Sequence, residues 1–124
     1  MTIYYFEKIK KRITELEWLI ERERIDTEYD EDADISKIGG NIVFMDGSVL
    51  HFKEIFIGQK MHYRFHYMDE KNNLITRWDN APHHKELSTF PHHVHLPDGV
   101  KENKSVKLID VLDKIENIVI ENLG

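Results

Sequence analysis

The stretch Met61-His62-Tyr63-Arg64-Phe65-His66-Tyr67-Met68-Asp69 alternates aromatic side chains with basic or histidine side chains. Side chains of a β-strand point alternately to the two faces of a sheet. Tyr63, Phe65 and Tyr67 therefore share one face, and His62, Arg64 and His66 share the other. This strand predicts a sheet with one face for packing and one face for polar chemistry.

The neighbouring segments predict strands that pair with it. Leu74 to Asn80 follows through the turn Glu70-Lys71-Asn72-Asn73. A turn of two or four residues would place Arg77 and Asp79 on the polar face and Trp78 on the aromatic one, whereas an odd loop would break this inference. Upstream, the apolar runs Ile42 to Met45 and Ser48 to Phe56 are joined by Asp46-Gly47, a pair favoured in type I′ hairpins. Together these segments predict an antiparallel meander of about four strands.

Helical periodicity flanks the sheet on both sides. Phe6, Ile9, Ile13, Leu16 and Ile20 recur at spacings of three and four, which predicts a helix from about Tyr4 to Arg24. The same spacing after Ser105, a candidate N-cap, predicts a closing helix. The acidic stretch 26–34 is expected to be a solvated loop. The fold class is therefore α+β, and we expect the first apolar stripe to face the sheet, with a homodimer or partner surface as the alternative.

Composition limits the classes of function. A chain of 124 residues fits a single domain, and the absence of cysteine excludes disulfides, cysteine-ligated metals and a thiol nucleophile. The formal net charge of −6 disfavours a protein that binds polyanions by bulk attraction. Neither a signal-like start nor a membrane-length apolar stretch is present in the sequence, so we expect a cytoplasmic protein without a membrane partner.

Residues 81–100 contain three prolines and predict a long loop without regular structure. Five of the eight histidines of the chain lie there, and the preceding hairpin adds further polar side chains. The resulting candidate cluster consists of Arg64, His66, Arg77, Asp79, Asn80, His83, His84, His92, His93 and His95.

Three interpretations of this cluster remain open from the residues alone. Arginines could bind a phosphodiester while two histidines exchange protons near neutral pH. Alternatively, His93 and His95 could bind a divalent ion together with His83 or Asp79. In the third interpretation the histidines are structural and donate to loop carbonyls. Spacing does not choose among them.

Three segments carry a resemblance to a known family. Tyr63-Arg64-Phe65-His66-Tyr67, Arg77-Trp78-Asp79-Asn80-Ala81-Pro82-His83-His84 and Thr89-Phe90-Pro91-His92-His93-Val94-His95 together resemble the TumE-type toxins of prokaryotic toxin–antitoxin systems. The resemblance covers Met61 to His95 closely and the flanking helix and first hairpin in outline. Lys85 stands where a proline is common. The resemblance implies a single toxin-like domain over residues 1–124 and a cognate DNA-binding antitoxin.

The cluster and the resemblance lead to the hypothesis of an endoribonuclease, similar to an mRNA interferase, that uses no metal or other cofactor. Arg64 and Arg77 would clamp the phosphate, and Asp79 would orient a histidine or pair with an arginine. His66 and one of the loop histidines, namely His83, His84, His92, His93 or His95, would move protons. Tyr63, Tyr67 and Asn80 would contact the RNA substrate, although the two tyrosines fit a core equally well.

Two other functions compete with this hypothesis. The first is a non-enzymatic protein that binds a nucleotide, a metal or its antitoxin, which the acidic total charge favours. The second, a nucleotidyl-transferring toxin, is disfavoured because the glycines form no phosphate-cradling pattern.

Overall fold

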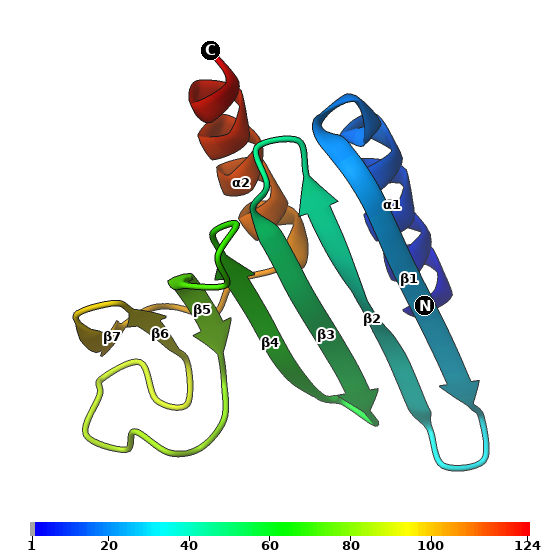
Figure 1. The fold of residues 1–124 in the computed structure, drawn as a ribbon. Helices are drawn as coiled ribbons and strands as arrows, with labels where there is room; N and C mark the ends of the chain where they lie inside the picture. Colours follow the sequence, from blue (N-terminus) through cyan, green and yellow to red (C-terminus); the bar gives the residue numbers. More distant parts are fainter. Residues whose placement is uncertain (1) are drawn as a thin grey trace.

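The computed structural model describes residues 2–124 and has an α+β architecture with a helix at each end (Figure 1). The elements in chain order are α1 (Thr2–Glu15), the short 3-10 helix η1 (Glu17–Leu19), β1 (Ile20–Asp30), β2 (Ile35–Phe44), β3 (Val49–Ile57), β4 (Lys60–Met68), β5 (Leu74–Asp79), β6 (His93–Leu96), β7 (Gly99–Glu102) and α2 (Leu108–Leu123). Among these residues, neither helix combines the length and the apolar character needed to cross a membrane.

The strands form one antiparallel sheet in the order β1-β2-β3-β4-β5-β6-β7, so each strand pairs with its neighbours in sequence. The predicted meander is confirmed, but the predicted count of about four strands is too low, since the sheet has seven. The additional strands are β1, β6 and β7. All three come from segments that carry many charges, histidines or prolines, which masked their strand character.

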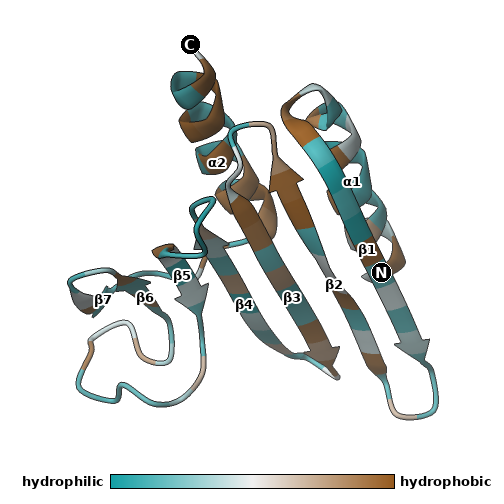
Figure 2. Ribbon diagram, in the orientation of Figure 1, coloured by the Kyte–Doolittle hydropathy of each residue, from teal (hydrophilic) through white to brown (hydrophobic). Residues whose placement is uncertain are grey.

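The N-terminal prediction was wrong beyond residue 15. The helix ends at Glu15 rather than near Arg24, and residues 20–30 form β1, which pairs with β2 along its whole length. The acidic stretch expected to be a loop is therefore mostly an edge strand. Figure 2 shows β1 largely hydrophilic. Charged side chains on an edge strand discourage pairing with other chains, which explains an acidic sequence in a sheet.

The prediction of an irregular loop over residues 81–100 was also wrong in its last part. His93-Val94-His95-Leu96 alternates and pairs with β5 on one side and β7 on the other. Pro97 lies in the turn between β6 and β7, where it removes no hydrogen bond from the sheet. The irregular segment is therefore limited to residues 80–92.

Both predicted hairpin turns exist, but each differs in detail. Gly47 has a φ of 88°, whereas Asp46 does not have a positive φ, so the turn is not type I′. The β4–β5 loop, 69–73, has an odd number of residues, but a register shift at Tyr67/Met68 compensates for it. This irregularity preserves the predicted alternation. The last helix begins after Lys107, so Ser105 is not its N-cap.

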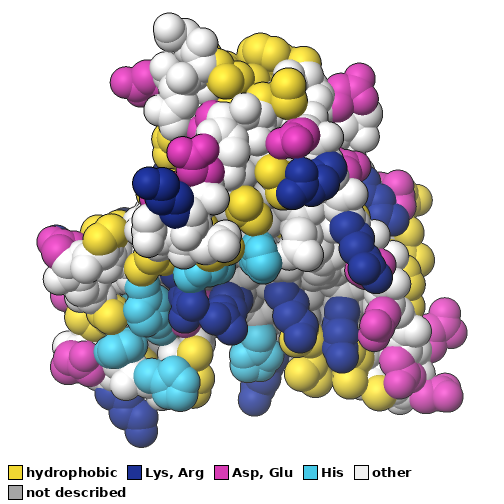
Figure 3. All heavy atoms as spheres, viewed as in Figure 1, with side chains coloured by type: hydrophobic (Ala, Val, Ile, Leu, Met, Phe, Trp, Pro, Cys, Tyr) yellow, Lys and Arg dark blue, Asp and Glu magenta, His cyan; other side chains and the backbone are white. Residues whose placement is uncertain are grey.

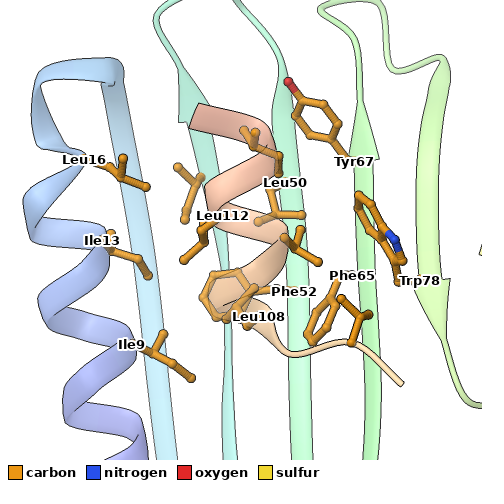
Figure 4. Close-up of a cluster of buried hydrophobic side chains, with 14 of the residues drawn as sticks. Ile9, Ile13, Leu16, Leu50, Phe52, Phe65, Tyr67, Trp78, Leu108 and Leu112 are labelled. Carbon is orange, nitrogen blue, oxygen red and sulfur yellow. The ribbon is translucent and has the colours of Figure 1, made fainter. Parts of the chain in front are cut away.

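Both helices cover the same face of the sheet, and the core lies between them and the sheet (Figure 1). Figure 4 shows Ile9 and Ile13 of α1, Leu16 just after it and Leu112 of α2 directed toward the inner side chains of the strands, among them Phe65. The apolar stripe of α1 is buried there, so it is not available for the homodimer surface considered from the sequence. No helix formed by residues 2–124 covers the opposite face of the sheet.

Candidate functional site

The sheet face turned away from the helices, here called the open face, carries basic and histidine side chains. Figure 3 shows Lys, Arg and His gathered in a band across it, with Asp and Glu mostly toward the edges of the view. On β4, Arg64 is exposed and His66 half-buried, while Tyr63 and Phe65, which alternate with them, are buried in the core. The positive charge is therefore local, although the chain as a whole is acidic.

Strand register arranges the open face in two rows. Partners across β2 to β6 give a first row of Asn41, His51, His66, Arg77 and His95. The second row, one pleat away, consists of Gly39, Lys53, Arg64, Asp79 and His93. Neighbouring strands lie about 4.8 Å apart, so consecutive members of a row can touch. The predicted sharing of one face by Arg64, His66, Arg77 and Asp79 holds, and β6 adds His93 and His95.

Asp79 joins the two histidines of β6. Its Oδ1 lies 2.8 Å from Nε2 of His93, and its Oδ2 lies 3.5 Å from Nε2 of His95. Asp79 and His93 are buried, with 7% and 2% of their surfaces exposed. His84 approaches from the loop, so that one ligand atom each of His84, His93 and His95 falls within 4.8 Å of the others. We call these four residues the histidine cluster.

A second polar contact links the neighbouring strands β4 and β5. Nε of Arg77 donates a hydrogen bond of 2.9 Å to Nδ1 of His66. Burial lowers the pKa of His66, and the positive charges of Arg77 and Arg64 lower it further. Burial likewise lowers the pKa of His95. Both imidazoles are therefore biased toward the neutral form.

A cleft of about 410 Å³ lies over Arg77 and the histidine cluster and extends to the loop, whereas His66 lines a neighbouring hollow. The charged and histidine residues that line the cleft are Lys53, His62, Arg64, Arg77, Asp79, His83, His84, His93 and His95. A second depression of about 570 Å³ crosses β1 to β4 and shares Lys53 and Arg64 with the cleft. The two hollows meet at these basic residues, so positive charge lies at their junction.

Several predicted site residues do not face the cleft with their side chains. Tyr63 and Tyr67 pack in the core with 4% and 0% exposure, and the hydroxyl of Tyr67 donates to Ser48, so core packing replaces the proposed stacking on bases. His92 is turned toward Tyr63, whose hydroxyl lies 2.8 Å from its Nδ1. Asn80 accepts from the amide of Tyr63 and donates to the carbonyl of Met61. Asn80 thus holds the hairpin together.

The site list drawn from the sequence omitted three residues that the structure brings into these hollows. His51 and Lys53 lie on the open face of β3, and His62 lies on that of β4. The alternation of β3, in which Leu50, Phe52 and Glu54 point inward, is a signal that could have identified the first two.

Comparison with known proteins identifies one family. The family model described as "Toxin TumE" matches residues 9–123, which is nearly the whole chain. No curated protein and no solved structure matches the chain.

Proposed function

The chain belongs to the TumE toxin family, and from this premise we propose that it is the toxin of a toxin–antitoxin module and cleaves RNA on the open face. The observation that carries the proposal is the convergence of Arg64, Arg77 and five histidines on one cleft, namely His62, His83, His84, His93 and His95. Guanidinium groups bind phosphate with paired donors, and imidazoles transfer protons near neutral pH.

The phosphate is held by the basic residues where the two hollows meet. Arg64 and Arg77 face the cleft from adjoining strands, and Lys53 is the register partner of Arg64. His66 accepts a hydrogen bond at Nδ1, so its neutral ring carries the proton on Nε2. His66 is therefore a hydrogen-bond donor to the phosphate in this proposal, not the general base considered from the sequence.

The proton transfers fall to the remaining imidazoles of the cleft. His93 has both ring nitrogens engaged, by Asp79 and by the carbonyl of Pro91, so it is not free to exchange protons with substrate. Of the four other imidazoles that line the cleft, His62, His83, His84 and His95, we assign the transfers to His95 and the exposed His83. One accepts the proton of the RNA 2′-hydroxyl as that oxygen attacks phosphorus. The P–O5′ bond breaks, the leaving oxygen takes a proton from the other imidazole, and a 2′,3′-cyclic phosphate and a 5′-hydroxyl form.

The test compares arginine variants in cells and on purified RNA. Inducing the wild-type chain without an antitoxin should stop growth, and the purified protein should cut RNA. Arg64→Ala and Arg77→Ala should each reduce cleavage by about 100-fold or more, because each removes a charged donor from the phosphate. Arg22→Ala is the matched control, since Arg22 is an exposed arginine of β1 outside both rows. Intact RNA after incubation with the folded wild type would overturn the proposal.

The rival function is a binding protein without chemistry. It predicts growth inhibition that falls in proportion to the affinity lost in the arginine variants, with no RNA products at any protein concentration. Membership of a toxin family also implies an antitoxin partner. Co-expression with the product of a neighbouring DNA-binding gene should restore growth, and a stable complex of the two proteins should be recovered.

A further inference from the structure

Potential ligand atoms converge at the inner end of the cleft. Nε2 of His93 lies 2.8 Å from Oδ1 of Asp79 and 3.1 Å from Nε2 of His95. Nε2 of His95 lies in turn 3.5 Å from Oδ2 of Asp79. Because His93 is only 2% exposed, bulk water does not separate these atoms. Their arrangement needs a positive charge between them.

The contact of the other ring nitrogen of His93, Nδ1, shows which nitrogen of the neutral ring carries the proton. Nδ1 lies 2.9 Å from the carbonyl oxygen of Pro91, and a carbonyl oxygen only accepts hydrogen bonds, so Nδ1 carries a proton. In a neutral ring Nε2 then presents a lone pair to the carboxylate of Asp79 at hydrogen-bond distance. Two arrangements remove this repulsion, a proton held between His93 and Asp79 or a metal ion shared by the surrounding atoms.

The surroundings favour the metal ion. A proton held between His93 and Asp79 requires only these two residues, yet His84 and His95 also direct ring nitrogens to the same place. Histidine ligands of metals characteristically donate their other ring N–H to a carboxylate or a backbone carbonyl. His93 does so to Pro91, and Nδ1 of His84 lies 3.3 Å from Oε1 of Glu86. We propose that Asp79, His84, His93 and His95 bind one divalent transition-metal ion, with Zn²⁺ as the best fit.

The spacing and the donor types support this choice of ion. Two ligands on a tetrahedral zinc at about 2.0–2.1 Å are roughly 3.3 Å apart, close to the 3.1 Å between the Nε2 atoms of His93 and His95. The ligand atoms of all three histidines lie within 4.8 Å of one another, so His84 has to move closer when an ion binds. Imidazole donors suit zinc, nickel, copper and cobalt, whereas magnesium and calcium prefer oxygen. Among residues 2–124, Asp79 forms ion pairs with His93 and His95 alone, so no arginine within salt-bridge distance competes for its carboxylate.

The metal site does not depend on RNA cleavage, but it would change which groups take part. A bound ion withdraws His95 from proton transfer and leaves His62 and His83 as the imidazoles of the cleft that are not ligands. It also adds a Lewis acid beside Arg64 and Arg77, where an oxygen of the phosphate can be polarised. This proposal differs from the hypothesis, drawn from the sequence, of an enzyme that uses no metal, and it takes up the metal-binding interpretation of the same histidines.

The experiment measures metal binding directly on the full-length chain, without a histidine tag and after treatment with a chelator. Calorimetric titration with Zn²⁺ should give one equivalent per chain, and Co²⁺ should give the intense visible absorption of a tetrahedral site. Mg²⁺ should not bind. His93→Gln and His95→Gln should each weaken Zn²⁺ binding by about 100-fold or more. His62→Gln is the matched control, because His62 lines the same cleft outside the histidine cluster.

A variant away from the core guards against misfolding as an explanation. Glu86 is exposed, so Glu86→Gln should keep the circular dichroism spectrum of the wild type. It should still weaken Zn²⁺ binding by about 10-fold, since it removes the carboxylate that orients His84. Unchanged affinity in the folded double variant His93→Gln/His95→Gln would overturn the proposal. So would nitrogen NMR spectra that show both ring nitrogens of His93 protonated in the presence of excess Zn²⁺.

An RNA assay with and without chelator separates the two proposals. Stoichiometric Zn²⁺ binding without RNA cleavage would leave the metal site standing and overturn the proposed activity. Cleavage by a protein that binds no metal would overturn the metal site and leave the proposed activity standing.

Discussion

Nε of Arg77 donates a hydrogen bond to Nδ1 of His66 at 2.9 Å, across the pairing of β4 with β5. An arginine cannot accept, so this contact fixes the tautomer of the neutral imidazole and directs its Nε2–H away from Arg77. It also brings a permanent positive charge next to a titratable ring. The electrostatics of the open face can therefore be tested at one residue.

Replacing Arg77 should raise the pKa of His66. Burial and the charges of Arg77 and Arg64 hold this pKa below its ordinary value, and Arg77→Met removes one of the two arginines. A proton NMR titration of the His66 ring should show the rise. Lys101→Met, on the exposed strand β7, is the control and should leave the titration unchanged. An unchanged pKa in Arg77→Met would mean that the charge of Arg77 does not contribute to the shift.

Glu54 should make the protein less stable as the pH rises. Glu54 is fully buried beneath α1, where burial raises its pKa from 4.5 to about 7, and Tyr5 donates a 2.7 Å hydrogen bond to it. Because the folded-state pKa exceeds the unfolded one, the stabilising contribution is complete below about pH 4.5. It is lost as the pH rises through about 7. This shift corresponds to roughly 3 kcal/mol of unfolding free energy.

Denaturant unfolding of the wild type and Glu54→Gln across pH 4 to 8 measures this effect. The variant carries an amide that does not titrate, so its stability should vary less over the window in which Glu54 ionises. Parallel pH profiles for the two proteins would show that Glu54 titrates normally.

Gly40 is required by the close approach of β1 to β2. A Cβ atom at this position would overlap the backbone carbonyl oxygen of Arg24 and lie 3.1 Å from the ring of Phe52. Gly40→Ala should therefore separate the two strands and destabilise the fold by about 1–3 kcal/mol, the usual range for overpacking. Asn41→Ala, at the next and exposed position, should change stability by less than about 0.5 kcal/mol. Thermal unfolding of both variants tests the difference.

Lys53 should contribute to RNA affinity through charge rather than chemistry. It lies beside Arg64 where the two hollows of the open face meet. For a single-stranded RNA that cannot be cleaved, the logarithm of the binding constant should fall by about 0.7 per phosphate contact for each tenfold rise in salt concentration. Lys53→Ala should make this salt dependence weaker by about 0.7, which corresponds to the loss of one contact. A slope equal to that of the wild type would exclude Lys53 from the RNA path.

The sequence by itself determined the periodic parts of the protein. The alternation of residues 61–69 assigned Tyr63 and Phe65 to the core and Arg64 and His66 to the opposite face, as the structure has them. Helical spacing located both helices, although the first was extended too far. The toxin family was recognisable from the segments around Arg77 and His93, and the family model confirms it. Each of these inferences rests on residues close together in the chain.

Only the tertiary structure decided which segments pair and which side chains meet. β1 and β6 are strands because β2 and β5 offer them partners, and their own charged or histidine-rich sequences give little sign of it. The same pairing puts His93 against Asp79 while the loop turns its neighbour His92 toward Tyr63. Adjacent residues with identical side chains thus have different roles, because strand register and burial act over distances that local sequence patterns do not contain.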